Sequence, residues 1–397
     1  MAQTFTTQLL PSLSSRLGIL QLNNPKSLNA LTLEMIRSMT PTLDAWQASG
    51  IVRATLMVGT PYEKKDGNTT PAFCSGGDVK SVYLAGMSND LVLPAEFFRE
   101  EYRLNHTIAT QPPHLPQVSI WDGVVMGGGV GLSVHGKYRI ATENTIFAMP
   151  ECKIGLYPDV GGSWWIPRLK LYSQWQNKLV VGGVGNYLAL TGARLKAEDL
   201  IYAGIATHYV KSNRLEELKR CLVDASDDDN SSKLEGLGDC VESVLISFHD
   251  NGIDSNASFL SQNRLDIDFA FDGKDSVEEI FDSLESMGPY SQFGTSTLSI
   301  LKTMSPTSLK VTLEGLKRGA KAQTIAEALQ MEYRIVMHMM KEGSDFYEGV
   351  RAALVDKDGN PKWSPANLID VTEEMVNRHF EELEDELSFT GNENAKL

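Results

Sequence analysis

Two carboxylates lie close together in a segment whose backbone is pinned by proline and glycine, MPECKIGLYPDVGG. Glu151 follows Pro150, Asp159 follows Pro158, and Gly161–Gly162 comes next. Prolines restrict the backbone just before each carboxylate, and the glycines permit a turn after the second. If the apolar neighbours exclude water, the pKa of each carboxylate rises toward the range that suits acid–base catalysis. The alternative, two loop carboxylates facing water, stays open on spacing alone. The apolar neighbours are Phe147, Met149, Ile154, Leu156, Trp164 and Trp165.

Two glycine-rich turns could supply a second chemical element. FCSGGDVK spans Phe73–Lys80, and VVMGGGVGL spans Val124–Leu132. Glycine leaves backbone N–H groups uncovered, and N–H groups from two segments can converge on one oxygen, as in an oxyanion hole. Each turn alone is also explained by a tight strand–helix crossing. The second turn lacks the G-x-G-x-x-G spacing, because Leu132 stands at the sixth position, so a dinucleotide site is disfavoured.

Several other classes of protein are disfavoured by missing patterns. GLSVH ends in His135 where a G-x-S-x-G hydrolase needs glycine, and H-E-x-x-H is absent. The four cysteines show no C-x-x-C spacing, which argues against a zinc site or a disulfide framework. The net charge of −15 argues against nucleic-acid and anionic-membrane partners. The longest apolar run, Val124–Val134, is too short to span a bilayer, and the N-terminus does not resemble a signal peptide. We therefore expect a cytoplasmic protein.

The elements that must position these residues follow from the hydrophobic pattern. Strands are predicted over 16–22 and 51–59, with a helix between them that Thr32 caps and Pro41 kinks or breaks. Residues 117–142 read as a strand, a turn, a buried glycine-rich helix and a strand. This alternation predicts an α/β fold up to about residue 165, after which helical periodicity dominates. The acidic loop at 224–239 suggests a boundary, with residues 1–230 as the catalytic core and 231–397 as a mainly helical region.

Taken together, four segments resemble the crotonase (enoyl-CoA hydratase/isomerase) superfamily, in the same order. They are NNPKSLNAL, AFCSGGDVK, GGGVGLS…IATENTIFAMPECKIGLYPDVGG and LTGARLKAEDLIYAGIATHYV. The likeness continues through FFREEYRLN, ALQMEYRI and DFYEGVRAALVDKDGNPKWSPANL, where the chain is more similar to the acyl-CoA thioester hydrolases of this superfamily than to its short hydratases. The resemblance implies a crotonase-like spiral of β-β-α units with a helical C-terminal region.

The resemblance also implies roles for individual residues. The oxyanion hole would be formed by the N–H groups of Gly77 and Gly128, and Glu151 and Asp159 would be the catalytic carboxylates. Glu101 would bind substrate, although on its helix the default interpretation of FFREEYRLN is a solvated face. The remaining substrate-binding positions would be Gly76, Asp78, Lys80 and Gly127.

The substrate implied is an acyl-CoA thioester, with coenzyme A as part of the substrate and with no separate cofactor or metal. Hydratases of the superfamily typically carry glutamate in the pattern GGG-x-E, whereas this chain has Gly131 at that position. This favours thioester hydrolysis, and a hydratase or isomerase remains the alternative. A homo-oligomer stays open, as does the role of the apparent insertion at 172–186. The basic residues of LKRGAK (Leu316–Lys321) could meet a phosphate of coenzyme A.

Overall fold

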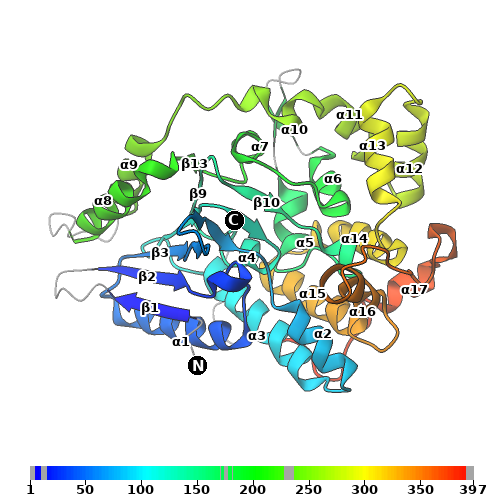
Figure 1. Cartoon of the computed structure of the whole chain (residues 1–397), viewed down its shortest axis with the longest axis horizontal. Helices are drawn as coiled ribbons and strands as arrows, with labels where there is room; N and C mark the ends of the chain where they lie inside the picture. Colours follow the sequence, from blue (N-terminus) through cyan, green and yellow to red (C-terminus); the bar gives the residue numbers. More distant parts are fainter. Residues whose placement is uncertain are drawn as a thin grey trace. The chain divides into compact units, whose positions relative to one another are not determined.

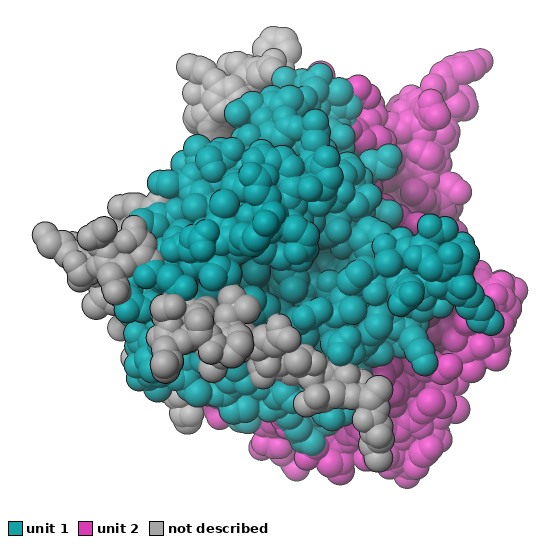
Figure 2. Space-filling view, turned by 60° about the vertical axis from the view of Figure 1, so that its left-hand side comes forward, with its two compact units in different colours: residues 1–77, 103–147, 195–258 teal, residues 78–102, 148–194, 259–397 magenta. Residues whose placement is uncertain are grey.

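A computed structural model describes residues 5–9, 16–169, 171–173, 178–180, 182–227 and 237–389. The chain folds as two compact units, each assembled from three separate stretches of sequence (Figures 1 and 2). Unit 1 comprises residues 1–77, 103–147 and 195–258, and unit 2 comprises residues 78–102, 148–194 and 259–397. This division differs from the predicted one, whose boundary at residue 230 lies outside the described residues.

Unit 1 is built on a six-stranded sheet with the order β1-β2-β3-β7-β9-β13. The first two strands pair antiparallel, and the other neighbouring pairs are parallel. The predicted strands at 16–22 and 51–59 are confirmed as β2 and β3. The strands are β1 (Phe5–Leu9), β2 (Leu17–Leu22), β3 (Ala54–Gly59), β7 (Gln117–Trp121), β9 (Tyr138–Ala141) and β13 (His208–Tyr209).

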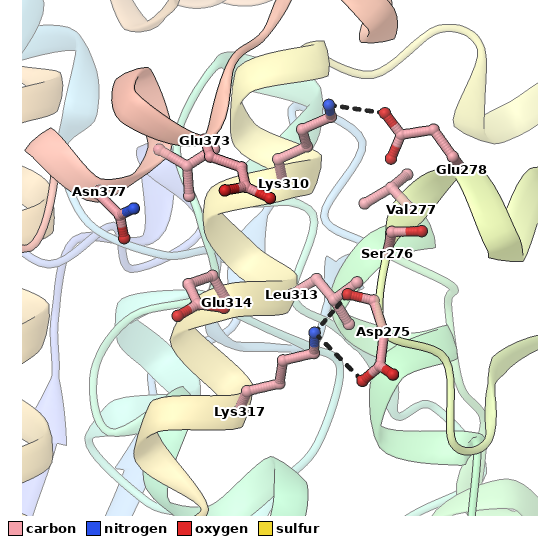
Figure 3. Close-up of a pocket in the computed structure, with 11 residues that line it drawn as sticks. Asp275, Ser276, Val277, Glu278, Lys310, Leu313, Glu314, Lys317, Glu373 and Asn377 are labelled. Carbon is pink, nitrogen blue, oxygen red and sulfur yellow. Dashed lines mark hydrogen bonds and ion pairs between the residues drawn. The ribbon is translucent and has the colours of Figure 1, made fainter.

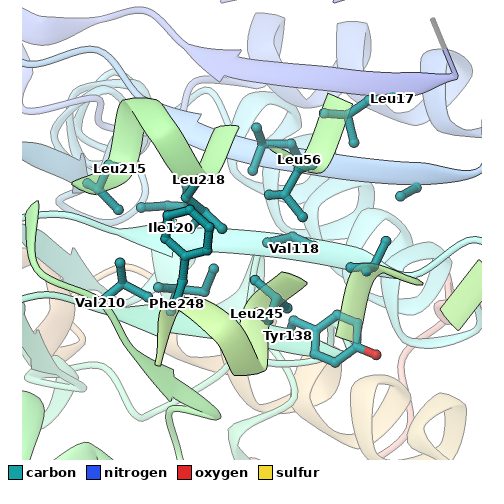
Figure 4. Close-up of a cluster of buried hydrophobic side chains, with 14 residues drawn as sticks. Leu17, Leu56, Val118, Ile120, Tyr138, Val210, Leu215, Leu218, Leu245 and Phe248 are labelled. Atoms are coloured by element: carbon teal, nitrogen blue, oxygen red, sulfur yellow. The ribbon is translucent and has the colours of Figure 1, made fainter. Parts of the chain in front are cut away.

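Helices cover both faces of this sheet, because apolar side chains of β2 point to both sides. Leu17 joins a buried cluster with α8 (Leu215–Asp227) and α9 (Leu237–Phe248), which Figure 4 shows. Gly18 points the other way, where an added Cβ would lie 2.6 Å from the Trp46 ring of α1 (Leu33–Ser49). Successive side chains of a strand face opposite sides of a sheet, so a strand buried on both sides reads as a nearly continuous apolar run. This is the reason for the LGILQL pattern.

The first helix begins as predicted and does not break. The Thr32 hydroxyl accepts a hydrogen bond from the Met35 N–H at 3.2 Å, which is the N-cap geometry. Pro41 lies inside α1, and the helix continues through it to Ser49, so of the two predicted alternatives, a kink or a break, the break does not occur. Met39 and Leu43, which flank the proline, are fully buried. Burial of the apolar face on each side of Pro41 offsets the loss of one backbone hydrogen bond.

The two glycine-rich turns follow neighbouring parallel strands in unit 1. These strands are β6 (Ala72–Cys74) and β8 (Val124–Met126), which belong to a three-stranded sheet with β10 (Ile146–Ala148). The carboxyl ends of parallel strands meet at one edge of a sheet, so the turns after Cys74 and Met126 lie together. An added Cβ on Gly76 would lie 3.4 Å from the Met126 carbonyl, and one on Gly129 would lie 2.7 Å from the Cys74 Cβ. The 2.7 Å contact means that the close approach of the two turns requires glycine at position 129.

Unit 2 is mainly helical, which confirms the predicted helical character of the C-terminal region. In Figure 1 its later helices run from yellow through orange to red. Its helices include α2 (Val79–Met87), α5 (Gly162–Trp165), α6 (Val184–Thr191), α10 (Phe259–Gln262), α11 (Arg264–Phe271), α12 (Val277–Ser286), α13 (Gln292–Leu301), α14 (Pro306–Gly319), α15 (Ile325–Met339), α16 (Asp345–Val350) and α17 (Glu373–Arg378).

Three further elements complete the framework around the glycine turns and carboxylates. Helix α3 (Val92–Ala109) contributes to both units, and α4 (Gly128–Gly131) and α7 (Ala197–Tyr202) belong to unit 1. The predicted insertion at 172–186 includes the antiparallel pair β11 (Leu171–Ser173) and β12 (Lys178–Val180), and its residues 174–177 and 181 lie outside the described residues. In the described parts of the chain, no helix combines the length and apolar character needed to cross a membrane.

Substituting Gly129 with alanine tests the packing of the two turns. Its Cβ would lie 2.7 Å from both the Cβ and the carbonyl oxygen of Cys74, so α4 or Cys74 in β6 must shift. We expect Gly129→Ala to lower the free energy of unfolding by about 1–3 kcal/mol, measured by urea denaturation. Gly315→Ala is the matched control, because its Cβ would be 3.7 Å from Ile335 and the substitution favours helix. Equal stability of the two variants would contradict the packing argument.

Candidate active site

Three carboxylates that the sequence singled out are buried together in unit 2. Glu101 lies on α3, Glu151 begins the short 3-10 helix Glu151–Ile154, and Asp159 lies in the loop before α5. Their exposed fractions are 2%, 5% and 4%. The electrostatic interactions of Glu101 with Asp159 and Glu151, and of Glu151 with Asp159, place the three groups near one another. Glu151 and Asp159 are therefore not loop carboxylates that face water, and Glu101 does not lie on a solvated helix face, which were the alternatives left open by the sequence.

Two tyrosines connect Asp159 to the rest of unit 2. The Tyr102 hydroxyl, one residue after Glu101 on α3, donates to Asp159 Oδ2 at 2.8 Å and lies 3.2 Å from the Tyr157 hydroxyl. The Tyr157 hydroxyl donates to the main-chain carbonyl of Glu332 at 2.6 Å. Both phenol rings are buried, so these hydroxyls have no bulk water to bind instead. The Asp159 carboxylate is therefore fixed by a buried donor.

The backbone that carries Asp159 is strained. Val160 has φ +52°, a left-handed conformation that is rare for a β-branched residue, and Gly161 follows at φ +81°. Such a conformation costs on the order of 1–3 kcal/mol and persists only where surrounding contacts determine it. Three of these contacts come from Glu332 on α15, which is fully buried. Its carboxylate accepts the Gly161 N–H at 2.7 Å, and the Ser163 N–H and hydroxyl at 2.8 and 2.6 Å.

The pKa values of these carboxyl groups are raised chiefly by burial. The pKa of Asp159 rises to about 6, although the hydrogen bond from Tyr102 opposes the shift. The pKa of Glu151 is raised well above its usual value by burial and then by the charge of Asp159. The pKa of Glu101 is raised well above its usual value by burial, then by Asp159 and Glu151. Asp159 thus ionises most readily of the three, because it alone among them accepts a hydrogen bond from a buried hydroxyl.

The other two carboxylates each present a buried oxygen with no partner. Glu101 Oε1 and Glu151 Oε2 make no hydrogen bond within the part of the chain that the structure describes. One helical turn beyond Glu101, both amide atoms of Asn105 are also buried and unpaired there. Buried polar atoms without partners are rare in folded proteins and are expected where a ligand or water binds. The carboxylate cluster therefore has capacity for a polar ligand.

In unit 1 the backbone of the two glycine turns is arranged so that two N–H groups stay available. The Gly76 carbonyl accepts the Leu31 N–H at 2.8 Å, and the Gly127 carbonyl accepts the Val130 N–H at 2.8 Å. Both Gly76 and Gly127 have positive φ, at 114° and 46°. The N–H groups of Gly77 and Gly128 take no part in the described hydrogen bonds that fix these turns. This is the local arrangement that the oxyanion-hole prediction requires.

Of the two predicted substrate-binding residues at the start of α2, Asp78 has a structural role. Asp78 is the N-cap of α2, where its side chain accepts the Ser81 N–H at 3.2 Å and the Ser81 hydroxyl at 2.6 Å. Lys80 lies in the first turn of α2 and is exposed. Contact of either residue with substrate stays a prediction.

Two of the three basic residues of LKRGAK, Lys317 and Arg318, are already engaged inside unit 2. Lys317 contacts the carbonyl and the carboxylate of Asp275, and Arg318 pairs with Glu314 at 2.6 Å and with Asn377. Lys317 also lines a pocket of about 570 Å³, where Lys310 pairs with Glu278 at 2.6 Å (Figure 3). None of the three buried carboxylates lines this pocket. The contacts give no support to a phosphate role for Lys317 and Arg318.

Sequence reasoning did not single out Tyr102, Tyr157 or Glu332 as parts of the site. Tyr102 and Tyr157 lie within two residues of Glu101 and Asp159, and an aromatic hydroxyl beside each carboxylate was the available signal. Glu332 is 171 residues from Gly161 in sequence, and only the tertiary fold brings them together. Its position among Leu329, Tyr333 and Val336 on the apolar face of α15 was the one sequence-level anomaly.

A family model for enoyl-CoA hydratase/isomerase matches residues 17–380. The chain therefore belongs to the enoyl-CoA hydratase/isomerase family, and it has the crotonase fold that the sequence predicted. Two solved structures match almost the whole chain. A carnitinyl-CoA dehydratase from Mycobacterium thermoresistibile is 34% identical with a TM-score of 0.81, covering 98% of this chain and 100% of that one. An enoyl-CoA hydratase from Rhodobacter sphaeroides is 31% identical with a TM-score of 0.80 and the same coverage.

Curated relatives are more similar in sequence and carry a different name. The 3-hydroxyisobutyryl-CoA hydrolase, mitochondrial, of Gallus gallus is 42% identical over 96% of this chain and 88% of its own length. The human protein of the same name is 42% identical over 92% of this chain and 86% of its own length. Because these relatives are named mitochondrial, the comparisons do not support the expectation of a cytoplasmic protein.

The raised pKa of Asp159 predicts a pH-dependent effect of Asp159→Asn on stability. Between the unfolded pKa of about 3.8 and the folded value of about 6, the folded chain keeps a proton that the unfolded chain releases. Wild-type stability therefore falls across this window as pH rises, and the asparagine variant lacks this fall. The stability of the variant relative to wild type should rise by up to about 3 kcal/mol between pH 4 and 7.

Urea denaturation of both proteins at half-unit pH steps measures this difference. Asparagine still offers an oxygen to the Tyr102 hydroxyl, so the variant keeps that hydrogen bond. A difference in unfolding free energy that does not change with pH would show that Asp159 titrates normally.

Proposed function

We propose that this protein hydrolyses the thioester of 3-hydroxyisobutyryl-CoA to the free hydroxy acid and coenzyme A. The observation that carries the proposal is the buried group of Glu101, Glu151 and Asp159, in a chain whose curated relatives are named for this hydrolysis. Gly131 supports it, because a fully buried glycine stands where the hydratases of the family typically place a glutamate. The place in metabolism that follows is the breakdown of valine.

The carbonyl oxygen of the thioester would bind to the Gly77 and Gly128 N–H groups. Negative charge develops on this oxygen during attack, and oriented backbone donors stabilise it without needing to reorganise. One such donor contributes roughly 2.7–4 kcal/mol to transition-state stabilisation. A backbone N–H cannot be removed by changing a side chain, so the turns themselves must be disturbed to test it.

Glu151 would act as the nucleophile or as the general base. As the nucleophile, its carboxylate attacks the thioester carbon and the C–S bond breaks, which gives a mixed anhydride that water then cleaves. As the base, it takes a proton from the attacking water, and the same C–S bond breaks. In both cases the departing thiolate of coenzyme A takes up a proton, and the carboxylate of Glu151 is regenerated.

Asp159 would control when Glu151 is ionised. The charge on Asp159 raises the pKa of Glu151, so a proton on Asp159, or a hydrogen bond from the substrate to it, lowers the pKa of Glu151 in turn. The two carboxyl groups then behave as a pair that shares one proton near neutral pH. Transfer of this proton from Glu151 to Asp159 would prepare Glu151 for attack.

The substrate's 3-hydroxyl would be recognised by Asp159 and Glu101. Glu101 Oε1 is buried and unpaired in the described chain, so an acyl chain without the hydroxyl would leave this oxygen unsatisfied. 3-Hydroxypropionyl-CoA differs from the proposed substrate by one methyl group, which is worth only about 1–3 kcal/mol of discrimination. We therefore propose it as a second substrate.

The alternative is an enoyl-CoA hydratase or isomerase, which the name of one solved relative, the enoyl-CoA hydratase from Rhodobacter sphaeroides, favours. A hydratase of this family typically needs a second glutamate at the position of Gly131, and isomerisation needs only one carboxylate. We propose that the reaction needs no separate cofactor or metal. Self-association into a homo-oligomer stays a prediction.

The proposal predicts release of free thiol from 3-hydroxyisobutyryl-CoA without hydration of crotonyl-CoA. The purified protein is mixed with each ester, with thiol reagent absorbance followed for the first and loss of enoyl absorbance for the second. Hydration without thiol release would replace the hydrolase by the hydratase. Inactivity toward both esters would remove the hydrolysis proposal.

Glu151→Gln should reduce turnover of 3-hydroxyisobutyryl-CoA by about 10²–10⁴-fold, because glutamine can act neither as nucleophile nor as base. Binding of the ester, followed by calorimetry, should survive because glutamine has nearly the same shape. Glu327→Gln is a matched control on an exposed residue of α15. Turnover close to wild type in Glu151→Gln would refute the assignment of Glu151.

A further inference from the structure

We infer that Glu332 is a positioning residue, which holds the strained loop of Asp159 in place and so directs the Asp159 carboxylate. Glu332 lies in the helical C-terminal region, on α15, and the relatives' names and the sequence motifs assign it no role. The inference rests on the proposed function, since the carboxylate that Glu332 directs is one we assign to hydrolysis.

The first observation is that all three hydrogen bonds which the described chain makes to the Glu332 carboxylate come from one short loop. Its Oε2 accepts from Gly161, and its Oε1 accepts from both the N–H and the hydroxyl of Ser163. In the described parts of the chain, no lysine or arginine pairs with it. A fully buried carboxylate without a cation is costly, so three donors from one loop indicate that loop and carboxylate stabilise each other.

The second observation is where this loop begins. Asp159 is followed by Val160 and Gly161, both with positive φ, and the Asp159 carbonyl accepts the Gly162 N–H at 2.7 Å. A valine leaves a left-handed conformation readily unless contacts on both sides prevent it. Glu332 makes the contacts on the C-terminal side of Val160. If they are lost, the loop is free to relax and the Asp159 side chain turns with it.

The third observation is that Glu332 also holds the N-terminal side of the loop. Its main-chain carbonyl accepts the Tyr157 hydroxyl, which lies 3.2 Å from the Tyr102 hydroxyl, and Tyr102 donates to Asp159 Oδ2. The contacts therefore form a closed ring that starts at Glu332, passes through Tyr157 and Tyr102 to Asp159, and returns through the loop to Glu332. All members of the ring belong to unit 2.

A residue that acts through Asp159 has a defined kinetic signature. Glu332→Gln keeps the shape of the side chain but turns an amide N–H₂ group toward one of the loop donors, so at least one hydrogen bond is lost. We expect kcat for 3-hydroxyisobutyryl-CoA to fall about 10- to 100-fold. Ser163→Ala removes one donor and should lower kcat by a smaller factor.

A double-mutant cycle separates positioning from general stabilisation. In the Asp159→Asn background, Glu332→Gln should cause no further loss of kcat, because there is no carboxylate left to direct. Glu327→Gln, on the same helix but exposed, should leave kcat unchanged in both backgrounds. Independent, multiplicative losses from Asp159→Asn and Glu332→Gln would overturn the inference.

Hydrogen exchange tests the same contacts without relying on activity. The Gly161 and Ser163 N–H groups should exchange about 10- to 100-fold faster in Glu332→Gln than in wild type or Glu327→Gln, measured on peptides covering residues 157–163. Unchanged exchange would overturn the inference, even if kcat falls. If Glu332→Gln does not fold, Ser163→Ala is judged by the same cycle and the same exchange measurement. An inactive wild-type protein would instead refute the proposed function, and exchange would still decide whether Glu332 holds the loop.

Discussion

The burial of four carboxyl groups in one compact unit is the constraint on which the rest of the site depends. Glu101, Glu151, Asp159 and Glu332 are all at most 5% exposed, and burial opposes the charge of each one. The fold treats them differently. Burial raises the pKa of Glu332 to about 8, and the three hydrogen bonds that it accepts oppose this rise. Asp159 accepts a hydrogen bond from the Tyr102 hydroxyl. Glu101 and Glu151 each keep an oxygen unpaired in the described chain, so these two have capacity left for substrate.

Local sequence patterns were sufficient to predict the parts of the molecule that local physics determines. The strands and the Thr32 cap follow from residues near one another in the chain. The buried state of Glu151 and Asp159 could also be expected from their apolar neighbours. At Pro41 the sequence left a kink or a break open, and the break does not occur because the apolar residues on both sides of it, which keep the helix intact, act through tertiary packing.

Local sequence patterns could not predict how the candidate site is organised. Glu101 was placed by default on a solvated face, because a helix carrying charged residues gives no indication of which side will be covered by a later segment. The same reason hides Glu332, whose partners are separated from it by more than 160 residues. The boundary predicted at residue 230 assumed that a unit is one continuous stretch of chain, whereas each unit is assembled from three.

The distance along the chain between Gly161 and Glu332 has a consequence for how the protein is made. A ribosome adds about 5–20 residues each second, so the 171 residues that separate them take roughly 10–30 s to appear. Throughout that interval the nascent chain already carries both glycine turns and the loop of Asp159, but not the helix that holds the loop. The left-handed Val160 conformation lacks the Glu332 contacts until α15 emerges, so the carboxylate cluster is completed late in synthesis, when the C-terminal helices of unit 2 dock.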